Sequence, residues 1–100
     1  MDFQQIDRFL RLYRMRLQSA NTLVGTTDQI TPIDIEGLEF AILNLQRLAK
    51  GWSVADVQRE IDETLQAAVN CSDKTAVGAS LWAKKVIRDL VQTDETIPSA

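Results

Sequence analysis

The fold is decided first by residues 3–24, which read FQQIDRFLRLYRMRLQSANTLV. Apolar side chains recur there at alternating steps of three and four residues, which is the spacing of one continuous face on an α-helix. That face consists of Phe3, Ile6, Leu10, Tyr13, Leu17, Ala20 and Val24. At about 100° per residue, Leu12 and Met15 fall on the opposite side, among arginines. The stretch therefore predicts one long helix with two apolar faces, one more than a helix of a small monomer needs.

Three further helices are predicted from capping residues and apolar spacing. Thr31 can cap a helix, and Pro32 fits its first position because the missing N–H would be unpaired there anyway. Lys50 and Gly51 close this second helix. Ser53 can cap a third helix, and a fourth begins near Ser72 and Asp73.

These helices predict an all-α fold, either a compact four-helix bundle or an orthogonal helical array. The two later connections are short, which favours antiparallel neighbours. One hundred residues suffice for one domain, which we place at residues 1–92. Residues 93–100 are acidic and contain Pro98, so we expect a disordered tail there.

The second helix also carries more apolar residues than one face can hold. Its main face is formed by Ile35, Leu38, Ile42, Leu45 and Ala49, whereas Ile33, Phe40 and Leu43 lie well away from it. A simple bundle requires one apolar stripe per helix. Two helices with a second stripe indicate either a layered core around a central helix or a surface for self-association, and we favour a homodimer.

Composition argues against most chemistry. The chain contains no histidine, so the commonest general base and the commonest metal ligand are both missing. We therefore predict no catalytic, cofactor or metal site, no identifiable small-molecule substrate, and a protein that is not an enzyme. Cys71 is the sole cysteine, which favours a reducing cytoplasm. The longest apolar run, residues 40–43, is far too short to span a bilayer.

Two aromatic residues and one thiol receive plain structural interpretations. Trp52 and Trp82 are expected to anchor the core. Cys71 is expected to act as a small apolar residue ahead of the fourth helix, because no histidine is available to activate it.

The first helix is locally cationic because it carries Arg8, Arg11, Arg14 and Arg16. In one interpretation, these arginines pair with acidic residues of the third helix in the same molecule, namely Asp56, Glu60, Asp62 and Glu63. In the other, Arg8, Arg11, Leu12 and Met15 form a docking face for a protein partner or a second copy, because arginine and apolar residues are typical of interfaces.

We therefore expect a small interaction or regulatory protein that acts by docking on a protein partner or by homodimerisation. Two alternatives stay open. Small antiparallel four-helix proteins of this length include bacteriocin immunity proteins of bacteria, an analogy of architecture that no motif supports. A nucleic-acid-linked regulator would use Arg8, Arg11 and Arg14 on phosphates, but the net charge of −3 disfavours general nucleic-acid binding.

Overall fold

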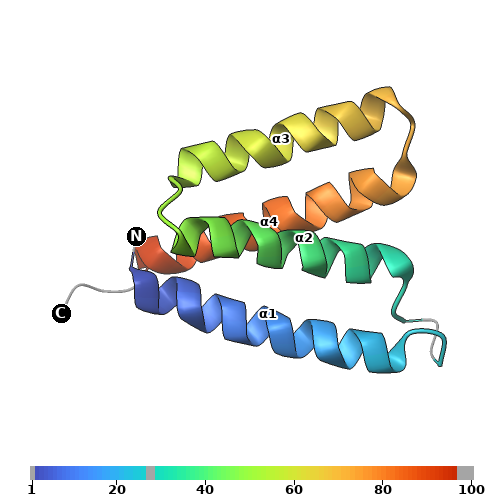
Figure 1. Cartoon of the computed structure of the whole chain (residues 1–100), viewed down its shortest axis with the longest axis horizontal. Helices are drawn as coiled ribbons and strands as arrows, with labels where there is room; N and C mark the ends of the chain where they lie inside the picture. Colours follow the sequence, from blue (N-terminus) through green and yellow to red (C-terminus); the bar gives the residue numbers. More distant parts are fainter. Residues whose placement is uncertain (1, 27–28, 97–100) are drawn as a thin grey trace.

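Four α-helices follow one another in residues 2–26 and 29–96, the part of the chain that the computed structural model describes (Figure 1). Their bounds are α1 (Phe3–Leu23), α2 (Pro32–Ala49), α3 (Val54–Asn70) and α4 (Lys74–Thr96). No strand occurs within these described residues. The predicted all-α four-helix fold is confirmed.

Each helix begins at a side chain that satisfies backbone N–H groups left free by the first turn. Asp2 accepts from the N–H of Gln4 at 2.9 Å, and Ser53 accepts from the N–H of Asp56 at 3.0 Å. Thr31 and Asp34 bond reciprocally in a complete capping box. Asp73 accepts from the N–H of Ala76 at 3.1 Å. The helix starts are therefore set by local sequence, as predicted.

The last helix extends further than the sequence predicted. We expected it to end before Thr93, but α4 runs to Thr96. The Thr93 hydroxyl donates to the Asp89 carbonyl at 2.7 Å, so this threonine is accommodated within the helix. No glycine or proline follows until Pro98. The first four residues of the expected tail are thus helical, and residues 97–100 lie outside the described part.

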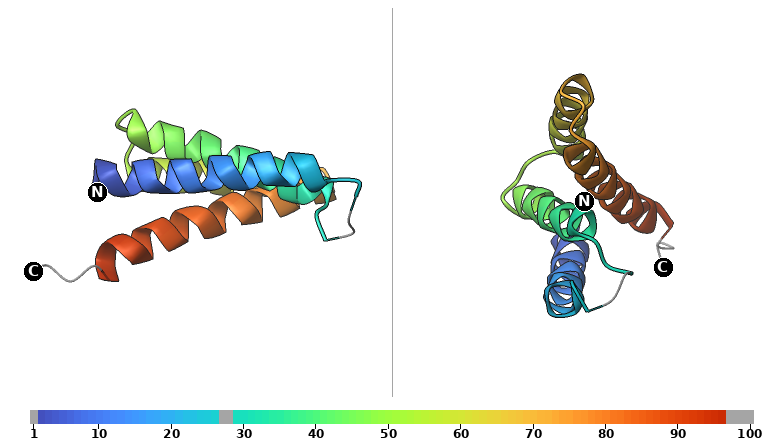
Figure 2. Two further views of the ribbon diagram at one scale, coloured as in Figure 1. Left: turned by 90° about the horizontal axis from the view of Figure 1, so that it is seen from below. Right: turned by 90° about the vertical axis from the view of Figure 1, so that its right-hand side faces the viewer.

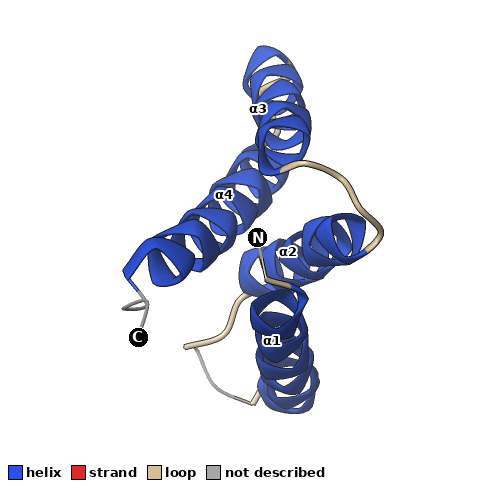
Figure 3. Cartoon of the chain, turned by 90° about the vertical axis from the view of Figure 1, so that its left-hand side faces the viewer, coloured by secondary structure: helices blue, strands red, loops and turns tan. Residues whose placement is uncertain are grey.

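The helices pack in the order α1, α2, α4, α3, which differs from their order along the chain. Seen along the helices, α2 and α4 lie between α1 and α3, which occupy opposite edges (Figure 3). The right-hand view of Figure 2 shows the same order from the opposite end. Within the described residues no Cα atom of α1 lies within 8 Å of a Cα atom of α3. The short connections predicted that α3 would neighbour both α2 and α4. α3 and α4 do pack together, whereas α2 and α3 make only slight contact.

Two glycines allow α2 and α4 to approach closely. A Cβ atom on Gly37 would lie 2.4 Å from Cγ of Trp82, and one on Gly78 would lie 2.5 Å from Cγ2 of Ile33. Side chains larger than hydrogen do not fit at these contacts. Ile33 opposite Gly78 and Gly37 opposite Trp82 also show that α2 and α4 run in the same direction.

The core lies along the central α2–α4 pair. Its largest fully buried side chains include Leu45 of α2, Ile61 of α3, and Ile87 and Leu90 of α4. None of the helices in the described ranges is long and apolar enough to cross a membrane.

Three residues expected in the interior are instead exposed. Phe3 and Ala49 lie at helix ends, and Phe3 is 64% exposed. Trp52 lies in the loop between α2 and α3, where the Arg47 guanidinium stacks 4.8 Å from its ring centre. The expectation that Trp52 anchors the core was therefore wrong, whereas Trp82 does pack against the core.

Candidate protein-docking surface

The side of α1 that faces away from the core carries an exposed row of residues, which we call the outer stripe. It consists of Arg8, Leu12, Met15, Ser19 and Leu23, all exposed. Their spacing of three or four residues keeps them on one face of the helix. Leu12 is 42%, Met15 67% and Leu23 45% exposed. The structure thus leaves the second apolar face of α1 uncovered within a single chain.

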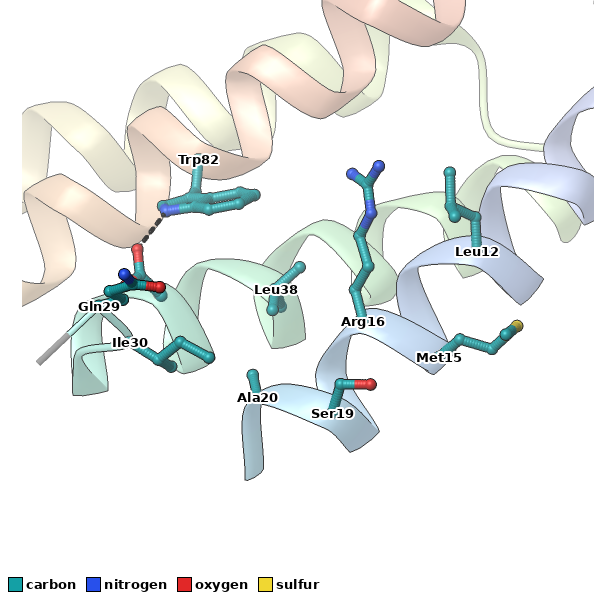
Figure 4. Close-up of a pocket in the computed structure, with 10 residues that line it drawn as sticks. Leu12, Met15, Arg16, Ser19, Ala20, Gln29, Ile30, Leu38 and Trp82 are labelled. Carbon is teal, nitrogen blue, oxygen red and sulfur yellow. Dashed lines mark hydrogen bonds between the residues drawn. The ribbon is translucent and has the colours of Figure 1, made fainter. Parts of the chain in front are cut away.

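Part of the outer stripe borders a groove of about 480 Å³ between α1, the start of α2, and α4 (Figure 4). On the α1 side, Leu12, Met15, Arg16, Ser19 and Ala20 line this groove. The opposite side is lined by Gln29, Ile30, Asp34, Leu38 and Trp82. Most of these side chains are apolar, so the groove can accept apolar groups from another molecule.

The wall of the groove opposite α1 is held by a hydrogen bond between distant parts of the chain. The indole N–H of Trp82 donates to Asp34 Oδ1 at 3.1 Å. Asp34 Oδ2 accepts from the Thr31 N–H at 2.9 Å, and this backbone bond is the main cause that lowers the pKa of the Asp34 carboxyl. Burial opposes that decrease, and the Trp82 bond adds to it. The Trp82 ring is therefore fixed to the first turn of α2.

The four arginines do not form one patch. Arginines three residues apart on a helix are displaced by about 60° around its axis, so Arg8, Arg11 and Arg14 wind away from the stripe. Arg8 lies in the outer stripe, whereas Arg11 bonds Asp7 at 2.9 Å in an exposed pair. Arg16 lies at the groove with its guanidinium 4.8 Å from the centre of the Tyr13 ring.

The interpretation in which these arginines pair with acidic residues of the third helix is wrong. α1 and α3 lie at opposite edges of the described structure, and no Cα atom of one lies within 8 Å of a Cα atom of the other. The long-range ion pair in that structure joins Lys84 of α4 to Asp62 of α3 at 2.9 Å. Neither Arg8 nor Arg14 has an ion-pair partner among the described residues. The cationic side of α1 is thus left to solvent or to another molecule.

The predicted docking residues therefore separate into two groups. Leu12 and Met15 line the groove, whereas Arg8 and Arg11 lie outside its lining. Arg16, Leu23 and Trp82 also belong to this surface and were not predicted for it from the sequence. Leu23 follows Ser19 by four residues and could have been found by extending the spacing of the stripe. Trp82 is distant in sequence, and no local pattern indicates that it lies across from α1.

Two of the three buried polar side chains in the described residues, those of Asn44 and Ser80, bond within their own helices. Asn44 is fully buried, donates to the Phe40 carbonyl at 2.8 Å, and accepts from Arg47 at 3.2 Å. The buried Ser80 hydroxyl donates to the Ala76 carbonyl at 2.8 Å. Among the described residues, no buried side-chain nitrogen or oxygen atom lacks a hydrogen-bond partner. Over the described ranges, no cluster of three side chains is suited to hold a metal ion, and Cys71 is exposed at the end of α3.

Comparisons with protein-family models, with curated proteins and with solved structures found no match to this chain. The immunity-type and nucleic-acid alternatives therefore stay predictions.

Proposed function

We propose that the protein is a docking module that binds a helix of a protein through the outer stripe of α1 and the adjoining groove. The supporting observation is the exposure of Leu12 and Met15 beside a largely apolar groove that ends at Trp82. Contiguous exposed apolar surface on a small protein is typical of an interaction site.

A helix is the occupant that suits this surface. The outer stripe repeats every three or four residues over nearly the whole of α1, which is the spacing by which two helices interdigitate. A helix lying along the stripe can insert apolar side chains into the groove beside Ser19 and Ala20. The Trp82 ring and the Arg16 guanidinium at the groove are residue types that contribute strongly to binding at interfaces.

The chain offers a closely matched control for a test of this proposal. Leu12 of α1 and Leu43 of α2 are the same residue type and are 42% and 43% exposed. Leu43 does not line the groove. A charge introduced at either position should leave the core intact, but a charge at Leu12 lies on the proposed docking surface.

The test is affinity capture from a lysate of the native organism with tagged wild type, the double variant Leu12→Glu/Met15→Glu, and Leu43→Glu. Far-UV circular dichroism should give the same helicity for all three. We expect wild type and Leu43→Glu to retain a common set of proteins, with untagged copies of this chain counted among them, and the double variant to lose that set.

Retention of the same proteins by the double variant would refute the proposal. Unfolding of the double variant would place Leu12 and Met15 in the core and would also count against it. Met15→Glu alone, at the more exposed of the two positions, gives an independent test in a variant expected to fold.

A further inference from the structure

The outer stripe of α1 has a symmetrical arrangement of large and small side chains. The midpoint of this arrangement lies between Met15 and Arg16. Leu12 lies as many residues before the midpoint as Ser19 lies after it. Arg8 and Leu23 are likewise equally distant from it. If a second α1 lay antiparallel across this one, Leu12 would face Ser19 of the second copy. A large apolar side chain would then meet a small one at both ends of the contact.

Two shallow, open depressions flank Ser19. The groove of about 480 Å³ lies on one side of Ser19, and a second hollow of about 450 Å³ lies beside the C-terminal half of α1. Met15 and Ser19 line both hollows. Figure 4 shows Ser19 and Ala20 as the short side chains of α1 beside the groove, with Met15 and Leu12 extending further along it. The same helix thus carries the large side chains of Leu12 and Met15 and, around Ser19, an open surface with room for a side chain of another molecule.

The distribution of charge favours the antiparallel arrangement. All four arginines of α1 lie within residues 8–16, whereas residues 17–26 carry no charged side chain. The last turn of α1 contains no basic residue that would compensate its partly negative carbonyl groups. An antiparallel pair places Arg8 of each copy near the C-terminal turn of the other. A parallel pair would instead place all four arginines of each copy beside the same arginines of the other, whereas the antiparallel pair does so only for Arg16 near the axis.

From this complementarity we infer that the occupant of the outer stripe is a second copy of the chain, with the two α1 helices antiparallel about a two-fold axis near Met15. The inference rests on the proposed docking function and specifies its partner. Met15 packs against the aliphatic part of Arg16 of the second copy, and Leu12 packs on the open surface around Ser19. A contact between single helices is small for a protein interface, so the dimer dissociates on dilution.

Sedimentation equilibrium over a range of concentrations tests self-association of the purified chain. Wild type and Leu43→Glu should approach twice the mass of one chain as concentration rises. Met15→Glu brings two carboxylates together near the axis and should weaken dimerisation by roughly tenfold or more, which corresponds to a change of at least one decade in Kd. A wild type that stays monomeric at every concentration overturns the inference.

Disulfide cross-linking tests the register of the pair. The native thiol is exposed, so the variants are made with Cys71→Ser. A mixture of Leu12→Cys and Ser19→Cys chains should form a mixed disulfide dimer under mild oxidation. Leu12→Cys alone should not, because the two copies of that residue would be separated by about 10 Å along the helices, which exceeds the usual reach of a disulfide. Leu43→Cys is the matched exposed control.

The outcomes separate the inference from the proposed function. A mixed 12–19 disulfide supports the antiparallel pair. A dimer in which Leu12→Cys chains cross-link to each other indicates a parallel pair and overturns it. A monomeric chain whose α1 captures a different protein also overturns it, but leaves the docking function standing. A monomeric chain with no α1-dependent capture refutes both.

Discussion

The second apolar faces of α1 and α2 look alike in sequence, yet only that of α2 is largely covered. In α2, Ile33 packs where Gly78 of α4 leaves space, and Phe40 packs against the buried core. In α1, Leu12 and Met15 stay exposed. The difference follows from packing order, because α2 lies between α1 and α4 whereas α1 lies at an edge.

Surplus apolar surface on a helix thus has two physical causes that sequence spacing does not separate. A central helix needs two faces because it has neighbours on two sides. An edge helix with two faces has one left over for another molecule. In α2, packing within the layered core accounts for Ile33 and Phe40, although Leu43 is still exposed. For α1 the second face is unexplained within one chain.

The largest expected effect comes from truncating the covered face. Phe40→Ala should lower the free energy of unfolding by about 2–3 kcal/mol, because Phe40 is partly buried against the core and loses most of that contact. Met15→Ala, on the uncovered face, should change it by less than about 0.5 kcal/mol. Urea unfolding at a concentration where the chain is monomeric measures both. Equal losses in the two variants would show that the faces do not differ.

A smaller effect is expected where α2 meets α4. Alanine in a helix interior is ordinarily more stable than glycine by about 0.5–1 kcal/mol. At Gly37 this sign should reverse, because the added methyl would meet the Trp82 ring and the helices would have to separate. We expect Gly37→Ala to destabilise the protein by about 1–2 kcal/mol in urea unfolding.

A matched comparison is Gly78→Ala. There the new methyl meets the Cγ2 methyl of Ile33, whereas at Gly37 it meets the Cβ and Cγ atoms of Trp82. This contact can relax more easily, so the loss should be smaller than at Gly37. A stabilised Gly37→Ala protein would contradict the close approach that makes α2 a central helix.

The smallest effect concerns the acid sensitivity of the contact between Asp34 and Trp82. The pKa of the Asp34 carboxyl is lower in the folded protein than in the unfolded chain, mainly because of the Thr31 N–H. The stability contributed by the ionised Asp34 carboxyl is therefore fully present above the pKa of the unfolded chain. It is lost as the pH falls below about 4, through the pKa of the folded protein. Asp34→Asn should cost about 1 kcal/mol at pH 7, and its difference from wild type should narrow below pH 4.

Glu36→Gln controls for the loss of one carboxylate from the same helix, because Glu36 is exposed. It should show no such cost at pH 7. A difference between wild type and Asp34→Asn that stays constant from pH 7 down to pH 2 would contradict the role assigned to the Asp34 carboxylate.

Much of the secondary structure could be predicted because helix starts are local events. Asp2, Thr31 and Ser53 each bond backbone N–H groups within three residues, so the capping geometry is encoded where it acts. The second face of α1 could also be predicted, since helical periodicity is a property of one segment. The end of α4 was predicted too early because its polar residues resemble a tail but do not break a helix.

The candidate site could be predicted only on its α1 side. Leu12 and Met15 follow from the spacing of one helix, but the opposite wall of the groove requires Trp82 to meet Asp34 across 48 positions of sequence. The predicted core role of Trp52 failed for a related reason, because an aromatic residue in a loop is buried only if another element covers it.

By itself, the sequence determined four helices, most of their ends, and the presence of two apolar faces on α1 and on α2. These features depend on hydrogen bonds and angular spacing within a few residues. Tertiary structure alone decided that α4 rather than α3 packs on α2, that α1 lies at an edge, and that the face bearing Leu12 and Met15 is the one left open. That choice depends on contacts such as Gly37 with Trp82, because only when the helices meet does the fit between distant side chains select a neighbour.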